Sequence, residues 1–124
     1  MAVPRITREE LKQRLDAADS STHPILIDVR LKYPFEHSTV KLPGAQRIAP
    51  DAIIAASLPR DRDLVLYDSD PDEIVASQAA AELIRRGLRA SVLKGGIAEW
   101  MNAKLPVDTK PAPQPSTAPG AAKG

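Results

Sequence analysis

The stretch "DLVLYDSDPDEIVASQAAAELIRRG", residues 63–87, indicates the fold class. It opens with a continuous apolar run, Leu64 to Tyr67, which is too short for a helix and is typical of a buried strand. After a polar turn, small and apolar side chains recur at helical spacing, and Gly87 marks the end of the predicted helix. A buried strand that leads through a turn into a helix is the repeating unit of α/β proteins.

The same pattern occurs on both sides of this stretch. "PILIDV" (residues 24–29) and "RASVLKGG" (residues 89–96) predict two further buried strands, and a brief strand is expected at Gln46–Ile48. Thr7 and Glu10 form a capping box ahead of a helix predicted to end near Ala18. "IAEWMNAKL" (residues 97–105) predicts a closing helix.

These elements predict one α/β domain with a central parallel sheet flanked by helices. The strands are apolar throughout, so helices should cover both faces of the sheet. We expect the domain to span residues 1–107. Residues 108–124 are rich in proline and alanine with little apolar bulk, and we expect them to form a disordered tail.

The composition excludes several classes of function. The 17 basic and 16 acidic residues give a net charge of +1 and are interleaved, so no nucleic-acid partner is expected. No apolar run is long enough to span a membrane and no secretory signal is recognisable, which predicts a cytoplasmic protein. The chain contains no cysteine, so it has no disulfides, thiolate nucleophile or zinc–thiolate site.

Any site is expected beyond the carboxyl ends of the parallel strands, where ligands bind in α/β sheets. Three polar segments follow the predicted strands and should meet at this edge. The expected site loop comprises Asp68, Ser69, Asp70, Pro71, Asp72 and Glu73, and the expected pocket rim comprises Asp28, Arg30, Gly95 and Gly96. His23 and His37 are isolated, and no metal or other cofactor is expected.

The segments "LIDVR", "LPGAQRI", "LVLYD" and "VLKGGIAEW" follow one another in the order seen in rhodanese-like domains, and the chain resembles that family over roughly Ile6 to Val107. In active members of the family, the position of Asp68 is a cysteine that accepts sulfur as a persulfide. The resemblance implies that backbone N–H groups of the loop and the following helix N-terminus stabilise an anion there.

The loop "DSDPDE" is most similar to a bacterial subgroup whose loop reads Cys-x-Cys-Pro-Asn-Glu. Pro71 and Glu73 are kept, whereas Asp68 and Asp70 stand at the two cysteine positions and Asp72 stands at the asparagine. A carboxylate forms no stable persulfide, and the acids of this loop would repel an anionic sulfur donor. The resemblance therefore implies an inactive domain that acts as a binding or regulatory module for an unknown protein partner or a small anion.

Two other interpretations of the acids remain. Asp72 and Glu73 would be favourable in the first turn of a helix, with Asp68 as its cap, and none of them would then have a functional role. Alternatively, "LVLYDSD" resembles the first motif of haloacid-dehalogenase-type phosphatases, in which Asp68 would attack phosphorus and both Asp68 and Asp70 would help to bind magnesium. Pro71, Asp72 and the short chain argue against this second interpretation.

Overall fold

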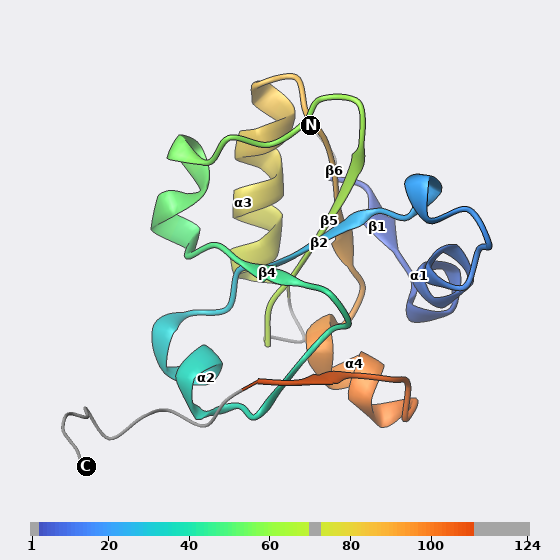
Figure 1. Ribbon diagram of the computed structural model, residues 1–124. Helices are drawn as coiled ribbons and strands as arrows, with labels where there is room; N and C mark the ends of the chain where they lie inside the picture. Colours follow the sequence, from blue (N-terminus) through green and yellow to red (C-terminus); the bar gives the residue numbers. More distant parts are fainter. Residues whose placement is uncertain (1–2, 70–72, 111–124) are drawn as a thin grey trace, which may run out of the picture.

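The structure is a computed structural model that describes residues 3–69 and 73–110 (Figure 1). Its elements follow one another as β1 (Arg5–Ile6), α1 (Arg8–Leu15), η1 (Ser20–Thr22), β2 (Ile25–Asp28), α2 (Lys32–His37), β3 (Val40–Lys41), β4 (Gln46–Arg47), η2 (Pro50–Ala55), β5 (Asp63–Tyr67), α3 (Ile74–Arg85), β6 (Arg89–Leu93), α4 (Gly96–Asn102) and β7 (Asp108–Thr109). Strands and helices alternate along most of this length, as the sequence predicts.

The main sheet has five strands in the order β1-β6-β5-β2-β4, and each neighbouring pair is parallel. This confirms the predicted parallel α/β fold. The strand β5 lies at the centre, with Asp28 of β2 beside Tyr67 at its carboxyl end. Asp68, which follows β5, therefore lies at the middle of the carboxyl edge of the sheet.

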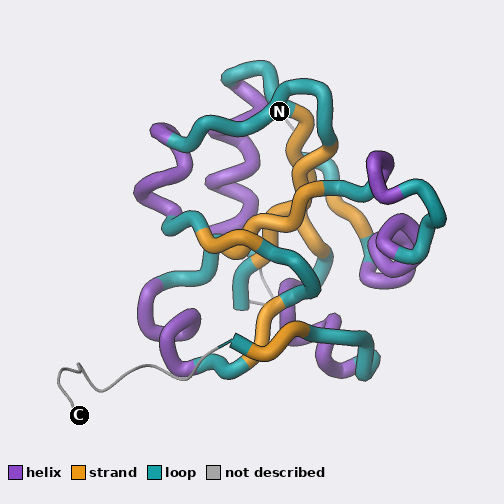
Figure 2. The backbone as a smooth tube through the Cα atoms, in the orientation of Figure 1, coloured by secondary structure: helices purple, strands orange, loops and turns teal. Residues whose placement is uncertain are grey.

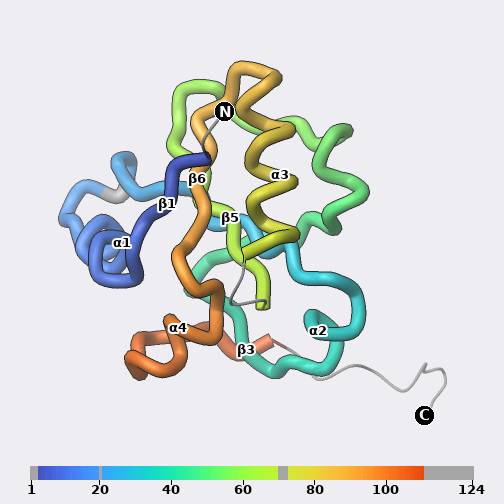
Figure 3. The backbone as a smooth tube through the Cα atoms, turned by 180° about the vertical axis from the view of Figure 1, so that it is seen from behind, coloured from blue at the N-terminus to red at the C-terminus, as the bar shows by residue number. Residues whose placement is uncertain are grey.

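Helices cover both faces of the sheet, as expected from the apolar strands. Leu64 and Leu66 of β5 point to the face that is covered by α3 and η2, whereas Val65 and Tyr67 point to the face that is covered by α1 and α4. Figures 1 and 3 show α3 on one side of the sheet and α1 with α4 on the other. Trp100 of α4 is fully buried and anchors the second layer.

The ends of the helices follow local sequence signals. The capping box at Thr7 is present, because its side chain accepts from the Glu10 N–H while the Glu10 carboxylate accepts from the Thr7 N–H. The helix ends at Leu15 rather than near Ala18. Gly87 adopts a φ of +87° after α3, the left-handed conformation expected of a glycine that ends a helix.

Residues 108–110 do not belong to a tail, contrary to the sequence-based expectation. Asp108 and Thr109 form β7, which pairs antiparallel with β3, and Figure 2 shows the two short strands side by side. The Lys110 N–H donates to the Thr39 carbonyl oxygen, and the Lys110 side chain is buried. The folded part of the chain thus includes residues 108–110, and the rest of the expected tail lies outside the described residues.

The short helix α2 contains a proline, Pro34. Pro34 is the third residue of α2, where a backbone N–H has no partner within the helix, so proline costs little there. Within residues 3–69 and 73–110, none of the helices has the length and apolar character needed to cross a membrane.

Candidate functional site

The described parts of the three polar segments meet at the carboxyl edge of the sheet. The Val29 N–H donates to the Tyr67 carbonyl oxygen at 3.0 Å, which joins the end of β2 to the end of β5. The Ile97 N–H donates to the Asp68 carbonyl oxygen at 2.9 Å, which joins β5 to the start of α4. These bonds fix the backbone on either side of Asp68.

The Asp68 side chain is buried at the N-terminus of α3 and does not project from a loop mouth. It is 2% exposed, and its Oδ2 accepts a hydrogen bond from the Ala76 backbone N–H at 2.8 Å. Ala76 lies in the first turn of α3, where backbone N–H groups have no partner within the helix. The carboxylate therefore fills a position that favours an anion, because it caps the positive end of the helix.

Two glycines leave the space that this arrangement needs. Gly96 has a φ of +64°, and a Cβ there would lie 2.4 Å from the Asp68 carbonyl oxygen. Gly95 has a φ of +78°, and a Cβ there would overlap the Glu99 side chain. A side chain at position 96 would therefore crowd the backbone of Asp68.

One interpretation of the sequence places Glu73 in the first turn of the helix, but Glu73 lies just before α3. It adopts a left-handed φ of 62°, and its carboxylate is turned toward β1. The carboxylate accepts from Arg5 Nε at 2.7 Å, from Arg5 Nη2 at 2.5 Å and from the Gly95 N–H at 3.0 Å. These contacts, Arg5 above all, hold the pKa of the Glu73 carboxyl below its ordinary value.

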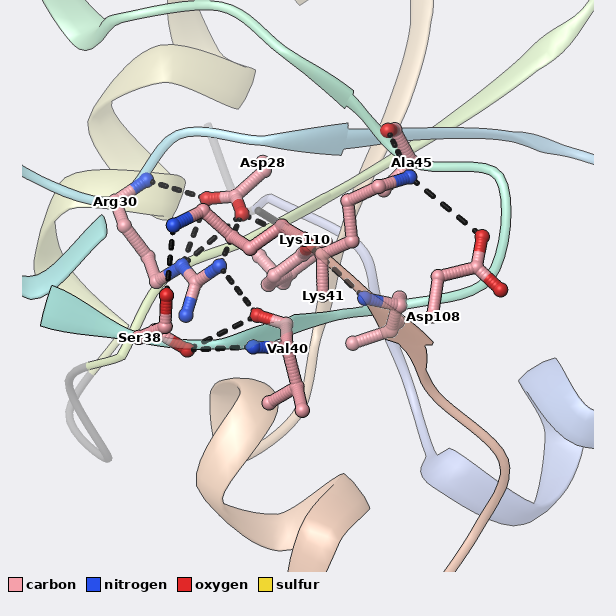
Figure 4. Close-up of polar contacts among 10 residues, drawn as sticks. Asp28, Arg30, Ser38, Val40, Lys41, Ala45, Asp108 and Lys110 are labelled. Atoms are coloured by element: carbon pink, nitrogen blue, oxygen red, sulfur yellow. Dashed lines mark hydrogen bonds and ion pairs between the residues drawn. The ribbon is translucent and has the colours of Figure 1, made fainter. Parts of the chain in front are cut away.

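Asp28 and Arg30 form a buried ion pair at the end of β2 (Figure 4). The Asp28 carboxylate accepts from Arg30 Nη2 at 2.6 Å and from the Tyr67 hydroxyl at 2.9 Å, and Arg30 Nη2 also donates to the Val40 carbonyl oxygen. Burial, followed by the Asp28 charge, raises the pKa of Tyr67. Arg30 therefore joins the end of β2 to β3 through its ion pair with Asp28 and its bond to the Val40 carbonyl oxygen.

The remaining residues of the predicted loop, Asp70, Pro71 and Asp72, lie outside the described residues. Within residues 3–69 and 73–110, no group of three or more His, Cys, Asp or Glu side chains is arranged to hold a metal ion.

The rhodanese-like domain family model matches residues 7–103, which is most of the chain. This chain belongs to the rhodanese-like domain family. A search of curated proteins gives no significant match.

Solved structures of similar proteins share this rhodanese-like fold. A protein from Lactobacillus plantarum has a TM-score of 0.74 and 21% identity, over 86% of this chain and 88% of its own. A rhodanese-like domain protein from Staphylococcus aureus has a TM-score of 0.67 and 21% identity, over 79% and 91% of the two chains. A rhodanese-related protein from Thermoplasma volcanium has a TM-score of 0.68 and 20% identity, over 85% and 97%. At these identities the likeness establishes the fold alone.

The rhodanese-like domain also uses residues that the sequence did not single out. Arg5 neutralises Glu73, and the Tyr67 hydroxyl contacts both Asp28 and the Leu42 N–H. Arg47 and Lys110 lie near the same sheet edge as Asp28 and line a pocket with it. These roles left no signal in the sequence, because each role depends on contacts between distant parts of the chain. Tyr67 lies in an apolar strand, and Lys110 lies in a segment of low complexity.

Proposed function

We propose that this rhodanese-like domain carries out no sulfur transfer through a protein persulfide and acts instead as a binding or regulatory module. The observation that carries the proposal is the hydrogen bond from the Ala76 N–H to the buried carboxylate of Asp68. By family resemblance, Asp68 stands where active members have the sulfur-bearing cysteine. An oxygen acid at that position caps the helix and cannot hold sulfane sulfur.

The contacts of Asp68 and Glu73 support a structural role for these two acids. Asp68 bonds to α3, and Glu73 bonds to Arg5 and to the Gly95 N–H. Glu73 is therefore compensated by a cation and contributes less to repulsion of an anionic donor than the sequence suggested. The proposed inactivity therefore rests mainly on two features of position 68: the side chain is buried, and it has no sulfur atom to carry a persulfide. Repulsion of an anionic donor by the loop acids supports it less strongly.

The same contacts weigh against the phosphatase alternative. A nucleophilic carboxylate must reach the phosphorus atom of its substrate, whereas the Asp68 side chain is 2% exposed and its Oδ2 is engaged by Ala76. We therefore favour the binding module. Its partner is an unidentified protein or a small anion, and a cytoplasmic location and a bacterial origin stay predictions.

The proposal is tested by two measurements on the full chain. Thiosulfate-to-cyanide sulfur transfer should not exceed that of a heat-inactivated sample. Affinity capture from the native host should recover partners that are lost when Asp70 and Asp72 are both replaced by lysine. Identical captured proteins from the two chains would remove the site loop as the binding surface.

A further inference from the structure

A pocket of about 430 Å³ lies beside the carboxyl ends of β2 and β4. Its lining residues include Phe35, Glu36, Lys41, Ala45, Arg47 and Lys110. This volume lies within the range of sites that bind small molecules, which are typically apolar with a few polar groups that fix the ligand. Phe35, Ala45 and the alkyl stems of the two lysines provide the apolar part.

Three cations surround the ring of Phe35. Arg47 Cζ and Lys110 Nζ each lie 4.5 Å from the ring centroid, and Arg30 Cζ lies 5.4 Å from it. The face of an aromatic ring attracts each cation, but the like charges repel one another. A bound anion would relieve that repulsion.

The available carboxylate does not neutralise this group. Asp28 is taken up by Arg30, so Arg47 and Lys110 have no ion pair within residues 3–69 and 73–110. Arg47 Nε is buried without a hydrogen-bond partner in that part of the chain. Lys110 Nζ donates to the Ser38 carbonyl oxygen at 2.6 Å, which leaves two of its three N–H donors for another acceptor (Figure 4).

We propose that this pocket binds a small organic oxyanion, a carboxylate or phosphate monoester on an apolar body, with its anionic head on Arg47 and Lys110 and its body against Phe35 and Ala45. The proposal rests on the proposed function, because it names a ligand class for the binding module. A guanidinium suits this head, because its N–H groups match the two oxygens of a carboxylate or phosphate.

Nearby acids set a limit on the affinity. Glu36 lines the pocket and makes no ion pair within the described ranges, and Asp108 Oδ2 lies 3.6 Å from Lys41 Nζ. Both carboxylates would repel an incoming anion. Binding should therefore be weak to moderate and should tighten when Glu36 is made neutral.

The test is a titration of the full chain with small-molecule probes, and two-dimensional ¹H–¹⁵N NMR spectra detect binding at each titration point. The probes are benzoate, phenyl phosphate and inorganic phosphate, with benzamide as a neutral control of nearly the same shape as benzoate. Benzoate or phenyl phosphate should give saturable shifts centred on Phe35, Ala45 and Arg47. Benzamide should bind at least tenfold more weakly, because it lacks the charge that Arg47 and Lys110 attract, and inorganic phosphate should bind more weakly because it lacks the apolar body.

Matched variants locate the site. Arg47→Gln should weaken binding about tenfold, which is the loss expected for one charge-assisted pair of hydrogen bonds. Arg47→Lys keeps the charge and should recover part of the affinity, and Glu36→Gln should tighten binding. Lys12→Gln removes the same charge from α1, which contributes no residue to the pocket lining, and should leave binding unchanged. If Arg47→Gln does not fold, Lys110→Gln and the opposite effect of Glu36→Gln carry the test.

The inference is overturned if neither organic anion binds saturably, if benzamide binds as tightly as benzoate, or if Arg47→Gln and Lys110→Gln have no effect. Shifts centred on Ser69 and Glu73 would also overturn it, although they would leave a binding role for the site loop intact. Sulfur-transfer assays on the same preparation separate the two proposals: turnover there contradicts the proposed function whatever the titration shows.

Discussion

The Asp68 carboxylate accepts a hydrogen bond from the Ala76 backbone N–H at 2.8 Å, so an acid from the end of β5 caps the helix that follows it. The residue just before α3, Glu73, makes no capping bond with its side chain. The cap therefore comes from Asp68, which lies eight positions before Ala76 in the chain. The N-terminus of α3 offers a donor that suits an anion, and the Asp68 carboxylate supplies that anion.

This cap should contribute measurably to stability. Asp68→Ala leaves the buried Ala76 N–H without this acceptor and should lower the free energy of unfolding by about 1–3 kcal/mol. Asp68→Asn keeps an acceptor oxygen but loses the negative charge at the helix N-terminus, and it should cost about 0.3–1 kcal/mol. Urea unfolding followed by circular dichroism measures both. An alanine variant as stable as wild type would show that the cap contributes nothing to the free energy of unfolding.

Gly96 should tolerate no larger residue, whereas Gly44 offers a matched control. Both have positive φ values, +64° and +71°, but a Cβ at Gly96 would lie 2.4 Å from the Asp68 carbonyl oxygen, while a Cβ at Gly44 would meet nothing within 4 Å. Gly44→Ala should cost about 1–2 kcal/mol for the left-handed backbone alone. Gly96→Ala should cost more, because backbone must also move. Equal thermal unfolding temperatures for the two variants would contradict the close approach of β5 and α4.

The ion pair between Arg5 and Glu73 should make the free energy of unfolding depend on pH in the acidic range. Because folding lowers the pKa of Glu73, its contribution is fully present above the unfolded value of about 4.3 and is lost as pH falls through the folded value. At neutral pH, Glu73→Gln should be less stable than wild type by about 1 kcal/mol, the typical net value of such a bond. Unfolding curves of the two chains should converge as pH falls below about 4. A gap that stays constant down to pH 2 would show that folding does not lower the pKa of Glu73, and it would contradict the stabilising pair with Arg5.

Magnesium-dependent phosphatase activity should be absent. The side chain of Asp68 is 2% exposed and bonded to α3, so it is poorly placed to attack phosphorus. Hydrolysis of p-nitrophenyl phosphate should stay at the buffer rate with and without magnesium. Activity that requires magnesium and disappears in Asp68→Asn, while that variant stays folded, would restore the phosphatase interpretation.

Local patterns were sufficient to predict the central part of the fold. The apolar runs at β2, β5 and β6 identified buried parallel strands, and the topology rule brought Asp28, Asp68 and Gly96 to one edge of the sheet. The capping box at Thr7 located the start of α1. Each of these features is encoded within a few neighbouring residues.

The features that were missed depend on contacts between distant residues. The strands β1 and β7 are only two residues long and carry no strand pattern of their own, since β1 forms on β6 and β7 forms on β3. The orientation of Glu73 toward Arg5, and the cations around Phe35, likewise involve partners from separate elements. Sequence could name the acids of the loop, but only the fold could show which of them are already paired.

The most direct test of the account measures thiosulfate-to-cyanide sulfur transfer by wild type, by Asp68→Cys and by a heat-inactivated control. We expect wild type to match the heat-inactivated control, because its side chain at position 68 is a buried carboxylate that caps α3. We also expect Asp68→Cys to show little or no turnover, because a side chain as enclosed as that of Asp68 is poorly accessible to a donor. Turnover by wild type that Asp68→Asn abolishes would contradict the central claim, and robust persulfide formation in Asp68→Cys would show that the site is open to sulfur donors.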